Sequence, residues 1–312
     1  MISLFRETTI GYIAAVIFSV IFGYFIANQF LASNETWSAV IPVILVLLFA
    51  RLFFHIASKK LEKIYNRYYN DCDAESFLNF FEKAAKQRWF RSMKNFVFIN
   101  LASGYLAVGK TYEATWALRK VGKMPNSKVG LTHQFTYYHL LFNYCVRIQE
   151  DIPTAESYVL EMQRLLENPK WKEAQKQPYM TSFAIAQCLL RMAKGDFDGC
   201  EAVFLSHREN AEAEIERVVG NFFLGEIYLH ENRRADAVDV FTYVALHGGN
   251  ASFQKRATKH LENLGATVPQ PKLQEEKLII FSLKEQIALY GFVSVSAPLS
   301  AFFAAWIIFW PM

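Results

Sequence analysis

Three long apolar segments near the two ends of the chain constrain its architecture more than any other feature. Residues 10–30 and 287–310 carry no charged side chain, and residues 37–55 carry one arginine, Arg51, near their end. About 20 apolar residues form a helix that crosses the roughly 30 Å hydrocarbon core of a bilayer. The sequence therefore predicts two N-terminal transmembrane helices and one C-terminal transmembrane helix. A cleaved signal peptide is the alternative for the first segment, although the segment is longer than the usual core of such a peptide.

Basic residues next to these segments indicate the orientation. The connection at 32–36 contains no lysine or arginine, whereas Lys59, Lys60, Lys63 and Arg67 follow the second segment. Short basic flanks stay on the cytoplasmic side. We expect an integral membrane protein of a bacterial plasma membrane, with the middle of the chain in the cytoplasm and the lipid bilayer as one partner.

Small residues recur at every fourth position within the first and third apolar segments. They are Gly11, Ala15, Ser19, Gly23 and Ala27, and then Ala297, Ala301 and Ala305. This spacing places them on one side of a helix and lets another helix approach closely. We expect these faces to pack against transmembrane helices of the same chain or of another membrane protein.

The middle of the chain contains a recurring helical pattern. Leu224, Gly225 and Tyr228 are followed after a polar turn by Ala237 and Phe241. The pattern resembles the L-G-x2-Y, A-x3-F skeleton of a tetratricopeptide repeat (TPR), in which small residues let two antiparallel helices approach and large residues fill the space between hairpins. The resemblance implies a hairpin of two helices at this position.

Other segments fit the same frame with decreasing fidelity. The small residue of the second helix falls at Ala114, Ala155, Cys200 and Ala237, at intervals of 41, 45 and 37 residues. These intervals exceed the 34 residues of the standard repeat, so the resemblance is to a divergent array. Residues 64–85 indicate a degenerate first hairpin, and residues 251–266 a polar helix that caps the end of the array.

These observations combine into one predicted fold. The fold class is all-α: a cytoplasmic TPR-like α-solenoid of about four to five hairpins, flanked by two N-terminal and one C-terminal transmembrane helices. The expected domains are 1–57 (transmembrane hairpin), 58–266 (repeats), 267–284 (linker with two prolines) and 285–312 (last transmembrane helix). An unrelated bundle of amphipathic helices is the alternative for the middle of the chain.

Motifs for catalysis, metal binding and cofactor binding are absent from the sequence. It contains no Walker A sequence, GxSxG or HExxH, and its four cysteines have no CxxC spacing. The acidic stretch around Asp73 is interpreted as a helix-start carboxylate. A net charge of +4 with interspersed acids gives no support for nucleic-acid binding. We expect no enzyme activity, no metal and no cofactor. The weaker alternative is an intramembrane enzyme site at Arg51 and His55.

The resemblance also implies a partner-binding groove along the first helix of each hairpin. Carrying over the family's groove positions gives Phe96, Ile99, Ser103, Tyr137, Leu140, Tyr144, Arg147, Ile185, Leu189, Phe222 and Glu226. Ile99 and Ser103 stand where chaperone-binding members have the lysine and asparagine of a carboxylate clamp, so a chaperone tail is not the expected ligand. If the register is shifted by one residue, these positions are core.

The resulting hypothesis is a membrane-anchored, non-enzymatic TPR adaptor or scaffold that recruits a protein partner, bound as a peptide or helix in the groove. The alternative is an accessory subunit of a larger membrane transport, secretion or enzyme complex, docked through its transmembrane helices. A homo-oligomer is a further possible use of the same surfaces.

Overall fold

The computed structural model describes residues 59, 61–86, 93–171 and 173–270. The chain divides into two compact units, Met1–Lys63 with Lys277–Met312, and Ile64–Glu276. Nearly all described residues belong to the second unit, called the helical domain below. Helices and no β-strand are found among the described residues, which confirms the all-α class.

The described part of the helical domain is a succession of helices. Residues 61–70 form a helix at its start. The helices that follow are α3 (Ala74–Ala85), α4 (Lys94–Val108), α5 (Thr111–Arg119), α6 (Lys128–Tyr144), the π-helical turn η2 (Cys145–Gln149), α7 (Ile152–Leu166), α8 (Glu173–Ala193), α9 (Cys200–Glu209), α10 (Glu214–His230), α11 (Arg234–His247) and α12 (Ser252–Asn263).

The turns predicted from the sequence separate these helices. Gly109 ends α4 in the left-handed conformation, with φ of 87°, which a residue without Cβ adopts at no steric cost. Glu150 and Asn232 take the same conformation, with φ of 54° and 60°, between α6–η2 and α7 and between α10 and α11. Asp73 begins α3, and its Oδ1 accepts a hydrogen bond of 3.1 Å from the Ser76 amide. The expectation of a helix-start carboxylate is confirmed.

Small side chains lie where paired helices approach each other. Ala114, Ala155, Cys200 and Ala237, the positions that define the repeat frame, are all fully buried. Gly225 shows how close the contact is in the last hairpin: a Cβ atom placed on it would lie 2.6 Å from the Phe241 ring. Large side chains therefore fit between the helices only because their partners are small.

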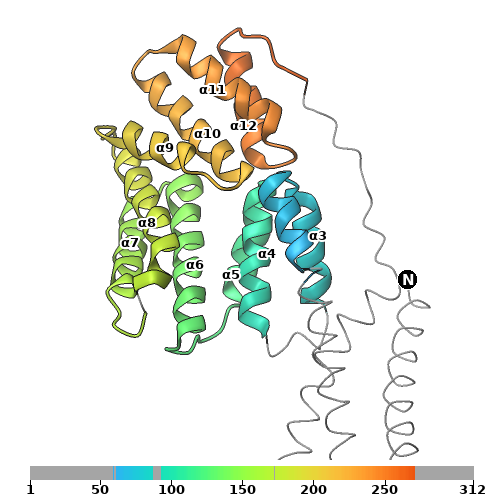
Figure 1. Cartoon of the computed structure of the whole chain (residues 1–312), viewed down its shortest axis with the longest axis vertical. Helices are drawn as coiled ribbons and strands as arrows, with labels where there is room; N and C mark the ends of the chain where they lie inside the picture. Colours follow the sequence, from blue (N-terminus) through green and yellow to red (C-terminus); the bar gives the residue numbers. More distant parts are fainter. Residues whose placement is uncertain (1–58, 60, 87–92, 172, 271–312) are drawn as a thin grey trace, which may run out of the picture. The chain divides into compact units, whose positions relative to one another are not determined.

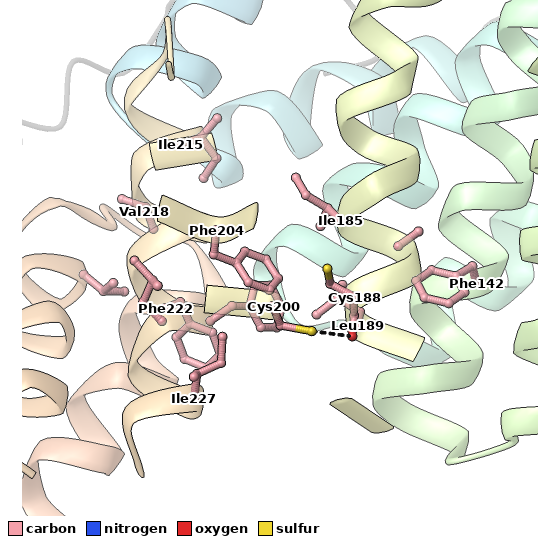
Figure 2. Close-up of a cluster of buried hydrophobic side chains, with 14 of the residues drawn as sticks. Phe142, Ile185, Cys188, Leu189, Cys200, Phe204, Ile215, Val218, Phe222 and Ile227 are labelled. Carbon is pink, nitrogen blue, oxygen red and sulfur yellow. Dashed lines mark hydrogen bonds between the residues drawn. The ribbon is translucent and has the colours of Figure 1, made fainter. Parts of the chain in front are cut away.

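A continuous hydrophobic core runs through the later hairpins. Figure 2 shows Ile185 and Leu189 of α8 facing Phe204 of α9 and Phe222 of α10. In the same region the Cys200 thiol donates a weak hydrogen bond of 3.8 Å to the carbonyl of Cys188. The four cysteines are free and buried.

The succession of hairpins closes on itself within the helical domain. Each helix packs against the next along the chain, and α4, α6 and α8 also contact one another in sequence, as α10 contacts α12. In addition α12 contacts α4, so the last helix lies beside the first hairpins (Figure 1). Asn250 forms the junction: its Nδ2 donates to Asp73 Oδ1 at 3.1 Å, and its Oδ1 accepts from the Glu75 amide at 3.1 Å. Helix α12, which was expected to be a terminal cap, therefore packs against α10 and α11 and also against α4.

Replacing Asn250 with alanine is expected to destabilise the helical domain. The change removes both hydrogen bonds and leaves Asp73, which is 5% exposed, with Arg67 and the Ser76 amide as its remaining partners. Losing hydrogen bonds to a buried charged group costs about 1–3 kcal/mol. Chemical denaturation followed by circular dichroism measures the loss. Asn210→Ala, which removes hydrogen bonds to the nearby Ser206 only, is the matched control with a smaller effect; equal losses would contradict a role in closure.

The transmembrane part of the predicted fold is corrected. None of the described helices is both long and apolar enough to cross a bilayer. The described part of the chain is therefore an all-helical domain without any of the three predicted membrane helices. The segments 10–30, 37–55 and 287–310 on which that expectation rests lie outside the described residues, as do the predicted packing residues from Gly11 to Ala27 and from Ala297 to Ala305. The predicted repeat domain is 58–266, and the compact unit of the structure is Ile64–Glu276. The predicted bounds stay a prediction.

Candidate functional site

The predicted groove residues lie on the first helix of successive hairpins. Helix α4 carries Phe96, Ile99 and Ser103, α6 with η2 carries Tyr137, Leu140, Tyr144 and Arg147, α8 carries Ile185 and Leu189, and α10 carries Phe222 and Glu226. We call α4, α6, α8, α10 and α12 the inner helices. Contacts between hairpins join these helices: α4 with α6, α6 with α8, α10 with α12, and α12 with α4.

Part of this set belongs to the core. The buried positions are Ile99, Leu140, Ile185, Leu189 and Phe222. Phe222 is 0% exposed, and its ring lies 5.8 Å from that of Phe241 and 5.1 Å from that of Phe253. Side chains packed in this way are not available to a partner unless the domain rearranges.

The other predicted positions keep part of their surface exposed. They are Phe96, Ser103, Tyr137, Tyr144, Arg147 and Glu226. The Phe96 ring lies 5.9 Å from the imidazole of His133, and the Tyr137 ring lies 5.6 Å from that of Tyr138. Burial raises the pKa of Tyr137, so its hydroxyl stays neutral at physiological pH. Partly exposed aromatic and polar side chains therefore lie on α4, α6, η2 and α10.

Glu226, one of these positions, is paired with a residue that the sequence analysis missed. Arg256 of α12 forms an ion pair of 2.8 Å between its Nη2 and Oε1 of Glu226. Its guanidinium also lies 4.3 Å from the centre of the Phe222 ring. No repeat position pointed to Arg256, because α12 was expected to be a solvated cap. The sequence did contain a signal that α12 is a packed helix. Arg256 follows Phe253 by three residues, and the same helix places Ala257 and Leu261 in the core.

Arg147 lies over two aromatic rings that pack next to Phe222. Its guanidinium is 4.8 Å from the centre of the Phe253 ring and 5.5 Å from that of Phe223, distances at which a cation is attracted to a ring face. Burial lowers the pKa of Arg147 to about 10; the positive charge of Arg256 adds to the shift and Glu226 opposes it. Burial raises the pKa of Glu226, and the positive charges of Arg256 and Arg147 act in the opposite direction. Arg147, Glu226 and Arg256 are called the arginine cluster below.

His139 of α6 provides a pH-dependent test of the inner helices. Burial lowers its pKa to about 4, and its Nε2 lies 3.2 Å from the Asn143 amide nitrogen, a donor that favours the neutral ring. Between pH 6.5 and about 4 the unfolded chain binds a proton that the folded chain does not, so stability falls as the pH falls through this range.

Thermal unfolding between pH 7 and pH 4 is expected to show this loss, and His139→Gln is expected to reduce its pH dependence. Burial lowers the pKa of His133, His207 and His260 in the same direction, so some slope remains in the variant. Identical slopes in the two proteins would contradict the assignment to His139.

Metal-binding chemistry has no support in the described part of the chain. No group of three or more His, Cys, Asp or Glu side chains there is arranged to hold a metal ion. Burial raises the pKa of Cys72 and of Cys188 to about 12, with nearby Glu214 and Cys200 as the next causes, so both thiols stay protonated.

Comparison with known proteins adds no identity. The chain matches no protein-family model, no curated protein and no solved structure. The candidate site therefore rests on the geometry of the helical domain alone.

Proposed function

We propose that the helical domain is a divergent TPR-like adaptor without enzyme activity, which binds a peptide or helix of a protein partner on its inner helices. The hairpins with buried small residues at Ala114, Ala155, Cys200 and Ala237 support the repeat architecture. Repeat arrays of this kind expose an extended face built from one helix of each hairpin, and that face usually binds other proteins.

The observation that carries the proposal is the arginine cluster beside half-exposed aromatic residues. Charged groups that are partly removed from water cost stability unless they are fully paired. Glu226 and Arg256 keep 27% and 40% of their side chains exposed, and Tyr137 and Tyr144 are half-buried on α6, the helix that continues into η2 and Arg147. Aromatic residues and arginine are also the side chains that contribute most to protein–protein binding energy.

The placement of this domain at a membrane stays a prediction from the sequence, because it rests on residues outside the described ranges. The same holds for the cytoplasmic location of the domain and for the alternative as an accessory subunit of a membrane complex. Neither is needed for partner binding on the inner helices.

Affinity purification of the full-length protein from its native source tests the proposal. The variant Tyr137→Ala with Tyr144→Ala removes two half-buried rings of the inner helices, whereas replacing Phe222 would disturb the core. Tyr112→Ala with Leu160→Ala is the matched control, since these outer side chains of α5 and α7 are 84% and 64% exposed. A partner lost only from the first variant, with both variants folded, is the expected result. A partner retained by both, or lost from both, contradicts binding on the inner helices.

A further inference from the structure

Arg147 holds a charge that no group in the described part of the chain neutralises directly. Its Nε is buried and has no hydrogen-bond partner there. No carboxylate among the described residues forms an ion pair with Arg147. Glu226 is close enough to raise the pKa of Arg147 through its charge, but its ion pair is with Arg256. The ring contacts to Phe223 and Phe253 partly compensate a cation but accept no hydrogen bond from the guanidinium edge.

Two arginines thus share one carboxylate beside an apolar platform. The rings of Phe222, Phe223 and Phe253 pack together, with Phe253 at 5.1 Å from Phe222 and 6.0 Å from Phe223. Arg256 lies over Phe222, and Arg147 lies over Phe223 and Phe253. Both guanidinium groups therefore contact the same group of three packed rings. The arginine cluster carries one net positive charge in a partly dehydrated place.

A buried guanidinium group without an ion-pair partner among the described residues is matched to an oxyanion ligand such as a carboxylate. Its planar set of N–H donors fits the two oxygens of a carboxylate, and such a pair is strongest where water is partly excluded. An apolar side chain next to the ligand carboxylate would contact the Phe253 ring, which keeps part of its surface exposed. The π-helical turn η2, which carries Arg147, adds to this argument, because short π-helical segments occur frequently at functional sites.

We propose that Arg147, with Arg256, binds a carboxylate of the partner peptide, and that Arg147 is left without an ion-pair partner among the described residues for this purpose. The inference rests on the proposed adaptor function and names the chemistry of its ligand. The proposed site is formed by residues of η2 and α12. It differs from the carboxylate clamp of chaperone-binding members, whose positions are Ile99 and Ser103 in this chain. The carboxylate comes either from the C-terminus of the peptide or from an aspartate or glutamate side chain.

The first test is the stability of the free protein. Arg147→Met keeps an apolar side chain of similar length and removes the unpaired charge, so the midpoint of thermal unfolding is expected to rise by about 2–4 °C. Arg256→Met is the matched control and is expected to lower the midpoint, because it leaves Glu226 unpaired. A fall of the midpoint in Arg147→Met would show that Arg147 stabilises the fold, and would overturn the proposal.

The second test observes the binding atom itself. In full-length protein labelled with ¹⁵N-arginine, the Nε–H signal of Arg147 is assigned by its loss in Arg147→Met. N-acetyl-leucine, N-acetyl-leucinamide and N-acetyl-glutamic acid α-amide are added at constant ionic strength, up to about 100 mM, which reveals dissociation constants in the millimolar range. The signal of Arg191, which is paired with Asp196 at 2.7 Å, is the internal control.

The expected result is that a carboxylate probe shifts the Arg147 signal, whereas the neutral leucinamide shifts neither signal. Movement with N-acetyl-leucine indicates a C-terminal carboxylate, and movement with the glutamate derivative a side-chain carboxylate. Arg147→Met is expected to weaken binding of the effective probe by about tenfold to a hundredfold, the usual loss for a hydrogen bond to a charged group. An unmoved Arg147 signal, or equal movement with leucinamide, overturns the proposal.

The two proposals fail in different ways. If a carboxylate probe shifts Arg147 but no protein depends on Tyr137 and Tyr144 for binding, the carboxylate site stands and the adaptor function fails. If a partner depends on these tyrosines while no probe reaches Arg147, the adaptor function stands and the carboxylate inference is overturned.

Discussion

Phe222→Ala is expected to destabilise the helical domain by about 3–5 kcal/mol, the usual cost of removing a fully buried phenylalanine. The Phe222 ring is 0% exposed and contacts Phe241 of α11 and Phe253 of α12, so its loss opens a cavity where three helices meet. The neighbouring arginine would also lose its ring contact, because Arg256 lies 4.3 Å from the Phe222 centre.

Denaturation by urea, followed by circular dichroism, measures this loss. Tyr137→Ala is the comparison within the predicted groove: Tyr137 is half-buried, and we expect a cost of about 1 kcal/mol, near the centre of the range for single substitutions. A similar cost for both variants would mean that Phe222 is accessible and that the groove assignment applies to it as well.

Gly225→Val is expected to destabilise the domain by about 3 kcal/mol, at the upper end for overpacked cores. The Cβ of the new side chain would lie 2.6 Å from the Phe241 ring, which is fully buried, and interiors are packed too closely for such a ring to move without cost. Valine gains little helix propensity over glycine compared with alanine, so local preference does not offset the clash. Thermal unfolding and urea denaturation both report the effect.

A second substitution separates steric crowding from a local backbone effect. Phe241→Leu shortens the ring that the new Cβ would meet and, in the Gly225→Val background, is expected to recover part of the loss. The two changes should therefore be clearly non-additive, as contacting residues usually are. Strict additivity would show that the cost of Gly225→Val arises elsewhere.

Much of the local structure could be predicted from the sequence, because single residues determine it. The left-handed turn at Gly109, the carboxylate cap at Asp73 and the small residues Ala114 and Ala237 each have a local physical cause. The structure contains helices on both sides of every predicted turn. These features follow from backbone sterics and from the close approach of paired helices.

The placement of hairpins relative to one another could not be predicted in this way. The contact of α12 with α4 depends on small rotations between successive hairpins, which no motif encodes. For the same reason the groove positions could not be separated into core residues, such as Ile185 and Leu189, and half-exposed residues, such as Tyr144. Arg256 was missed because its role depends on α12 packing against α10, which brings it to Glu226.

The closing contacts between α12 and the first hairpins have a consequence for folding kinetics. In an open array each hairpin depends on its neighbours alone, so ends fray and folding spreads from any nucleus. Here Asn250 and Asp73 are 177 residues apart along the chain, and bringing them together restricts the whole intervening segment. The junction should therefore form late in folding, and once formed it prevents unfolding from either terminus, so the domain unfolds as one cooperative unit.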